Sequence, residues 1–187
     1  MQLLCSLIVA LLALATTAVG VPKDNRVALT PDTVAPAGLT NIHDFLGNSL
    51  VALTGDGPND VPVVAVSASS DNETSQQWTF APLRNTGLFE VESAVPGNIG
   101  GLFMSSGPSS PNFSAMVVSE LDFLDFALIT IGSGPGILLI EDRSGQALTS
   151  WAVEGLDHTP VTLAPISPDL QNQQSWTILA APAAATA

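Results

Sequence analysis

Short apolar segments separated by turn residues fill the chain from residue 39 to residue 179. Gly, Pro, Asn, Ser or Asp stands between one segment and the next, as in 47–48, 55–58, 97–98, 106–108, 144–145 and 167–169. Gly permits positive φ and Pro fixes φ, so these residues favour turns. Short apolar runs bounded in this way predict the strands of an all-β barrel or sandwich. The predicted strands are 39–42, 50–53, 61–66, 78–80, 88–91, 102–104, 116–118, 126–131, 137–140, 148–151, 161–163 and 176–179.

An aromatic marker divides these strands into three groups of four. Trp78 and Trp176 each stand two residues after a Gln and are 98 residues apart. Phe126 lies near the midpoint, 48 residues after Trp78 and 50 before Trp176. Such self-similarity at a fixed period is the sequence signature of a repeat architecture.

A glycine marker gives the same period independently. Gly38, Gly87 and Gly136 are 49 residues apart, and each is followed by an aliphatic residue and by another three positions later. We therefore predict an all-β fold, a β-trefoil with three pseudo-repeats of about 49 residues. The repeats are expected at 38–86, 87–135 and 136–180, within one domain of residues 38–180.

The motifs Gln76-Gln77-Trp78 and Gln174-Ser175-Trp176 resemble the QxW repeat of secreted ricin-B-like lectins. The resemblance covers roughly residues 38–180 and suggests a fungal-type extracellular member. It implies that the aromatic residue fills the barrel core and that the Gln holds the neighbouring loop. The middle repeat departs from the motif, with Leu124 and Phe126 in those places. The expected structural core is built on Trp78, Phe126 and Trp176.

The same resemblance implies a shallow sugar site in each repeat, with an acid just after the second strand begins. The corresponding residues are Val51, Phe103 and Thr149, and the chain has no tyrosine for sugar stacking. We therefore expect sugar sites that are largely lost or atypical. The third repeat keeps the best candidate set, in which Trp151 would stack on a sugar and polar neighbours would bind its hydroxyls. These neighbours are Asp142, Asp157 and Asn172; in the alternative interpretation Trp151 is an ordinary core or capping residue.

An apolar run over residues 3–19 resembles a secretory signal peptide, with cleavage expected before Val21. The predicted order is a signal peptide at 1–20, an N-terminal extension at 21–37, the trefoil, and a disordered tail at 181–187. A retained signal anchor is the alternative. Asn72 and Asn112 open N-glycosylation sequons. The single cysteine, Cys5, lies in the signal segment, so we expect a secreted, extracellular protein without disulfides.

Charge excludes some functions. Seventeen acids against four Lys and Arg give a net charge of −13, which disfavours nucleic acid and anionic membranes. The expected partners are glycans or an extracellular protein. The two histidines, His43 and His158, each adjoin an Asp but form no triad motif, and no metal-ligand spacing appears. We therefore expect no catalytic residues, no metal and no cofactor.

Three functions remain open at this point. The first is a lectin-like carbohydrate-binding module, implied by the resemblance. The second is an extracellular protease inhibitor of trefoil fold, presenting loops such as 56–60 or 108–112. The third is a structural or cell-surface protein without a ligand.

Overall fold

The computed structural model describes residues 37–53, 61–68, 73–110, 113–131, 134–151 and 157–181. The predicted signal segment, nearly all of the N-terminal extension, Asn72, Asn112 and residues 182–187 lie outside this set. Among the described residues, none of the helices combines the length and apolar character needed to cross a bilayer.

Twelve strands and two short 3-10 helices make up the regular structure of the described residues, four strands to each repeat. The first repeat holds β1 (Thr40–His43), β2 (Asn48–Ala52), β3 (Val61–Ser67), η1 (Thr74–Gln76) and β4 (Gln77–Pro82). The second holds β5 (Leu88–Ser93), β6 (Leu102–Ser110), β7 (Phe113–Ser119) and β8 (Asp125–Thr130). The third holds β9 (Ile137–Glu141), β10 (Ala147–Ser150), β11 (His158–Ala164), η2 (Pro168–Leu170) and β12 (Thr177–Ala180).

The first and last strands of the three repeats pair in a closed ring. Antiparallel pairing runs from β12 to β1, β4, β5, β8 and β9. An isolated bridge between Ile137 and Trp176 returns from β9 to the start of β12 and closes the ring. A closed barrel leaves no unpaired sheet edge around its wall.

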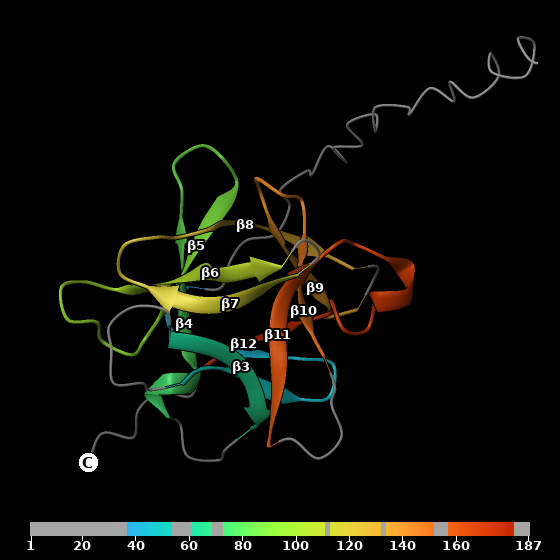
Figure 1. Cartoon of the computed structure of the whole chain (residues 1–187), viewed down its shortest axis with the longest axis horizontal. Helices are drawn as coiled ribbons and strands as arrows, with labels where there is room; N and C mark the ends of the chain where they lie inside the picture. The colour runs from blue at the N-terminus through green and yellow to red at the C-terminus, as the bar shows by residue number, and fades with distance from the viewer. Residues whose placement is uncertain are drawn as a thin grey trace, which may run out of the picture.

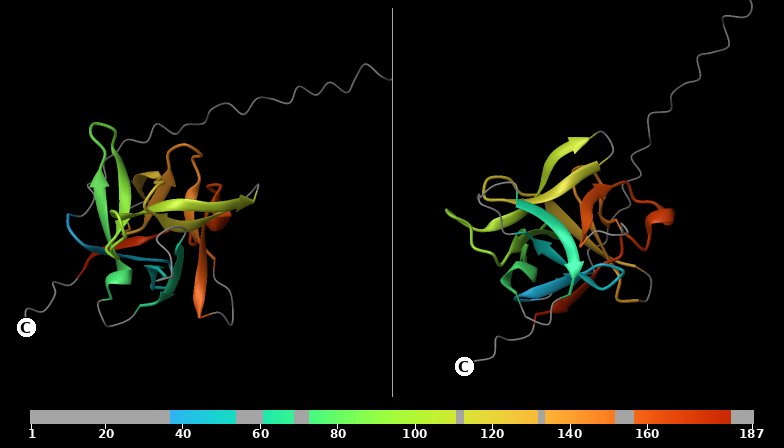
Figure 2. Two further views of the ribbon diagram at one scale, coloured as in Figure 1. Left: turned by 60° about the vertical axis from the view of Figure 1, so that its left-hand side comes forward. Right: turned by 60° about the horizontal axis from the view of Figure 1, so that its bottom comes forward.

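The middle two strands of each repeat form a hairpin, and the three hairpins pack together over the barrel. The hairpins are β2–β3, β6–β7 and β10–β11. Their second strands, β3, β7 and β11, also pair with one another, each with both of the others. Figure 1 shows these three strands meeting in the middle of the view, and the two turned views in Figure 2 show the β6–β7 hairpin extending to one side.

The pairing register reproduces the three-fold arrangement predicted from the sequence. Thr40 lies opposite Trp78, Phe89 opposite Phe126, and Ile137 opposite Trp176. The positions on the first strand are therefore 49 and then 48 residues apart. Gly38 and Gly87 precede their strands with positive φ, whereas Gly136 is not among the glycines with positive φ. In this register Gly136 is one residue out of step with the other two glycines.

The core follows from the alternation of side chains along the barrel strands, where every second residue points inward. Ile42, Val91 and Leu139 occupy corresponding inward positions and are fully buried. The three aromatic residues Trp78, Phe126 and Trp176 are also fully buried and belong to the same apolar cluster.

Each core tryptophan ties the barrel to the hairpin of its own repeat. The indole Nε1–H of Trp78 donates to the carbonyl of Leu50 at 2.9 Å, and that of Trp176 donates to the carbonyl of Leu148 at 2.9 Å. In both cases donor and acceptor are 28 residues apart. A buried indole N–H needs a partner, so this bond fixes the height of the first hairpin strand on the barrel.

The glutamine of the third-repeat motif holds the loop before β12, as the family resemblance implies. Gln174 Nε2 donates to the carbonyl of Pro165 at 2.9 Å and to Thr149 Oγ1 at 3.2 Å. Its Oε1 accepts the amide of Ser167 at 3.3 Å. This fully buried side chain thus connects β10 with the segment that follows β11.

A second three-fold feature supports the turns that leave the barrel. Ser93 and Glu141 lie opposite Trp78 and Phe126, and Asp44, which follows His43, takes the corresponding place near Trp176. Each of these three buried side chains accepts the backbone N–H two residues ahead: Ser93 from Val95, Glu141 from Arg143 and Asp44 from Leu46. Such local bonds replace ladder partners where the chain turns.

Replacing Trp78 or Trp176 by Phe keeps a ring in the core, as Phe126 does, but removes the indole donor. We expect each change to lower the free energy of unfolding by about 2–4 kcal/mol, because a buried carbonyl loses its partner and a cavity forms. Urea unfolding followed by circular dichroism measures this. Trp151→Phe is the matched control: its Nε1–H donates to the part-buried Thr162, so it should cost less than about 1 kcal/mol. Equal losses in core and control variants would contradict the assigned role.

Asp44 makes the richest set of turn bonds, so Asp44→Ala should be more damaging than Ser93→Ala. The Asp44 carboxylate accepts the amides of Leu46 and Asn48, the Asn48 side chain and the Ser150 hydroxyl, the last at 2.8 Å. We expect losses of about 2–4 kcal/mol for Asp44→Ala and about 1 kcal/mol for Ser93→Ala in the same unfolding assay. A Ser93→Ala loss as large as that of Asp44→Ala would contradict this ranking.

Candidate functional site

Two of the three positions where the family resemblance places a sugar-binding acid are buried. Val51 and Thr149 are buried on β2 and β10, opposite Val64 and Thr162. Thr149 Oγ1 donates to the Ala147 carbonyl and accepts from Gln174, so its hydroxyl already has protein partners. Phe103 is part-buried on β6. The side chains at the first and third of these positions are therefore packed inside the protein.

Trp151 follows β10 and is held in one orientation while remaining part-exposed. Its backbone N–H donates to the carbonyl of Pro160 at 2.9 Å, and its indole Nε1–H donates to Thr162 Oγ1 at 2.8 Å. Two hydrogen bonds to β11 thus anchor both ends of the residue. A fixed aromatic ring at a surface can cover the apolar face of a ligand with little loss of side-chain entropy.

Only part of the polar set predicted around Trp151 lies at the same end of the hairpin. Ser150 donates its amide to the carbonyl of Gln173, which brings the turn containing Asn172 beside Trp151. Asp157 directly precedes β11, on the side of the hairpin where Trp151 pairs with Pro160. Asn172 and Asp157 are both exposed.

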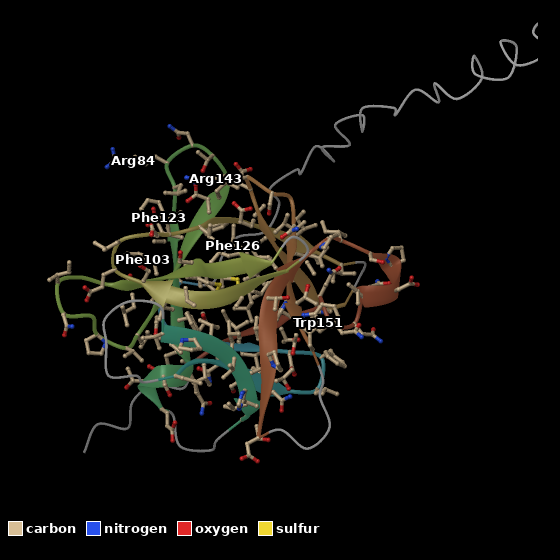
Figure 3. All side chains as sticks on the ribbon, viewed as in Figure 1. Arg84, Phe103, Phe123, Phe126, Arg143 and Trp151 are labelled. Atoms are coloured by element: carbon tan, nitrogen blue, oxygen red, sulfur yellow. The ribbon has the colours of Figure 1, made fainter. Side chains whose placement is uncertain are left out.

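Asp142 lies at the other end of β10. Ala147, at the start of β10, pairs with Ile140, and Asp142 donates its amide to the carbonyl of Asp125. The four residue steps from Ala147 to Trp151 span about 13 Å of extended strand. Figure 3 shows Arg143, the neighbour of Asp142, well apart from Trp151. Asp142 is therefore no partner of Trp151 in a single small site.

The corresponding position of the first repeat carries Leu53, whose amide donates to the carbonyl of Pro62 just as Trp151 donates to Pro160. Leu53 packs against the apolar core. The first and third repeats thus share the hairpin geometry, but Trp151 stands in the third repeat where Leu53 stands in the first.

The structure places the two His–Asp neighbours in different surroundings. The Asp44 carboxylate is occupied by turn amides and hydroxyl donors, and His43 Nδ1 lies 3.3 Å from the Gly47 carbonyl and 3.4 Å from Ser49 Oγ. His158 is exposed and its strand position pairs with Val66. Among the described residues, no group of three His, Cys, Asp or Glu side chains is placed to hold a metal ion.

Sequence reasoning missed an apolar surface on the second repeat, made of Ile99, Phe103, Leu121 and Phe123. Phe103 and Phe123 meet edge to face with ring centroids 6.2 Å apart. Glu120, which precedes Leu121, accepts the amides of Asn98 and Ile99 and so joins the two loops. The sequence signal that could have revealed this surface is the presence of large apolar residues within Gly-rich and acidic turn segments. We call this set the second-repeat apolar surface.

The sequence matches no model of a known protein family, and it has no significant match among curated proteins. Solved structures do resemble its fold. The agglutinin of Rhizoctonia solani has 13% identity and a TM-score of 0.65, covering 79% of this chain and 98% of its own. The designed three-fold symmetric protein ThreeFoil has 16% identity and a TM-score of 0.62, with 75% and 97% covered.

A ricin B-like lectin of Macrolepiota procera, solved in complex with lactose, has 18% identity and a TM-score of 0.61. The match covers 79% of this chain and 99% of the lectin. Toxin chains are also among the similar structures, so the likeness concerns fold and not activity. Together with the closed ring and its three hairpins, these matches show that the chain has a ricin-B-like β-trefoil fold.

Proposed function

We propose that this protein is a secreted, non-catalytic carbohydrate-binding module of the QxW type, with one atypical site centred on Trp151. The observation that carries the proposal is the fixed, part-exposed indole, held by Pro160 and Thr162 at the end of the hairpin where the exposed residues Asp157 and Asn172 also lie. Sugar sites combine a flat aromatic face with a few hydrogen-bonding groups.

The polar groups suited to the sugar hydroxyls are the Asp157 carboxylate and the Asn172 amide. A carboxylate accepts hydrogen bonds from hydroxyls, and an amide both donates and accepts them. The indole N–H is already used by Thr162, so Trp151 would contribute its ring face and not its donor. The site is thus expected to be shallow and weak.

The charge of the chain favours neutral glycans over anionic ones. A net charge of −13 repels sialylated or sulfated chains, and Asp157 would add to this repulsion locally. The lactose complex of the Macrolepiota procera lectin makes lactose a suitable first probe.

The proposal includes the extracellular setting predicted from the sequence. It takes residues 1–20 as a cleaved signal peptide, Asn72 and Asn112 as glycosylated, and the protein as a fungal-type extracellular member of the QxW family. A chain whose only cysteine lies at position 5 would be stabilised outside the cell by its core alone.

Replacing Trp151 by Ala should weaken glycan binding while the trefoil stays folded. The protein, expressed in a glycosylating host, is first screened on a glycan array, and the best neutral glycan and lactose are then titrated by calorimetry. We expect Trp151→Ala to weaken binding at least about tenfold, equal to about 1.4 kcal/mol, and Trp151→Phe to keep part of it. Asn172→Ala should weaken it and Asp142→Ala should leave it unchanged.

Ile99→Ser is the control, because Ile99 lies on the second repeat and touches none of these residues. Circular dichroism and urea unfolding check the fold of every variant. Binding that survives Trp151→Ala in a folded protein contradicts the site. No glycan binding on the array together with inhibition of an extracellular protease would instead support the trefoil inhibitor alternative. A negative result in both assays would support a structural role.

A further inference from the structure

The second-repeat apolar surface exposes large side chains that lie outside the apolar core. Ile99 is 78% exposed, Leu121 68% and Phe123 47%. Contiguous exposed apolar groups with a polar rim are characteristic of interaction sites, whereas single exposed residues are ordinary. Figure 3 shows Phe103 and Phe123 together on one side of the view, and Trp151 on the other.

The loop that presents Ile99 is held in place. One Glu120 carboxylate oxygen accepts the N–H groups of both Asn98 and Ile99, the latter at 3.0 Å. Gly97 and Gly101 permit this close packing, because a Cβ on either would collide with the carboxylate of Glu120 or Glu92 respectively. The backbone thus fixes Ile99 outward beside Leu121, and little ordering remains to be done on binding.

An acidic row borders this surface. On β5, Glu92 lies opposite Phe103 and Glu90 lies opposite Asp125 on β8. Two like charges directly opposite on neighbouring strands destabilise the sheet. Asp125 Oδ1 is buried and has no hydrogen-bond partner. A cationic group of a partner would offset the repulsion between Glu90 and Asp125.

The second repeat has no cation of its own to supply. Residues 87–135 contain five acids and no Lys, Arg or His. A second copy of this chain would bring five further acids to the contact, and an anionic membrane would be repelled for the same reason. Charge complementarity therefore selects a cationic occupant with apolar side chains.

We propose that the second-repeat apolar surface, with Glu90, Glu92 and Asp125 at its border, docks a basic, apolar peptide segment of a partner protein. The apolar side chains of the segment cover Ile99, Leu121 and Phe123, and its Lys or Arg residues face the acidic row. The site is separate from Trp151 and independent of glycan binding.

The probe is a short synthetic peptide in which lysines flank two leucines, titrated by fluorescence anisotropy against the full-length protein. Ile99→Ser with Leu121→Ser should weaken binding at least about tenfold, as for hot-spot side chains. Glu90→Gln should weaken binding and reduce its salt dependence. Because this change also removes the repulsion with Asp125, we expect it to leave the fold intact, which circular dichroism checks. Peptides with Glu for Lys or Ser for Leu should not bind.

Trp151→Ala and Ile166→Ser are the controls, since Trp151 belongs to the proposed sugar site and Ile166 is an exposed apolar residue of the third repeat. Both should bind the peptide like the unchanged protein. Failure of the unchanged protein to bind, or binding that survives the Ile99/Leu121 double change, overturns the proposal. So does a dimer, or binding to phosphatidylserine vesicles, that the double change abolishes, because either would assign the surface to a different occupant.

Discussion

The bond between a buried indole and the first strand of its own hairpin is the constraint on which the trefoil depends. Trp78 and Trp176 fill the barrel, and each donates to a carbonyl of the hairpin that covers it. Barrel and hairpins are short-stranded sheets that would be marginal alone. The tryptophan ring fills the barrel core, and its Nε1–H bonds to the hairpin. The same residue therefore fixes the position of the hairpin on the barrel.

The sequence predicted the architecture because its signals were local and repeated. Each of the twelve apolar segments overlaps an observed strand, and the Gln-x-Trp spacing identified residues that the structure buries. Phe126 keeps the ring without the donor, which shows that volume is required in every repeat and the N–H in only some. Strand ends differed by one or two residues in most cases; β6 differed more, since it continues to Ser110 through a register shift after Ser106.

The candidate site was harder to predict because closeness in sequence is not closeness in a hairpin. Asp142 and Trp151 are nine positions apart, yet β10 runs between them and places them at opposite ends. Asn172 is farther along the chain but adjoins Trp151 through the Ser150–Gln173 bond. The sequence alone showed that Val51, Phe103 and Thr149 stand where the resemblance implies an acid. The structure adds that Val51 and Thr149 are buried, so an acid at either position would be costly.

The strand pairing is equivalent at all three junctions between repeats, so only the covalent connection of the chain decides which repeat comes first. β12 pairs with β1 just as β4 pairs with β5 and β8 with β9, and Ala181 donates its amide to the carbonyl of Leu39. The junction between the last and first repeats is thus equivalent to the turn around Asn85. A circularly permuted chain, opened at that turn and joined beyond β12, would retain every strand pairing of the native barrel.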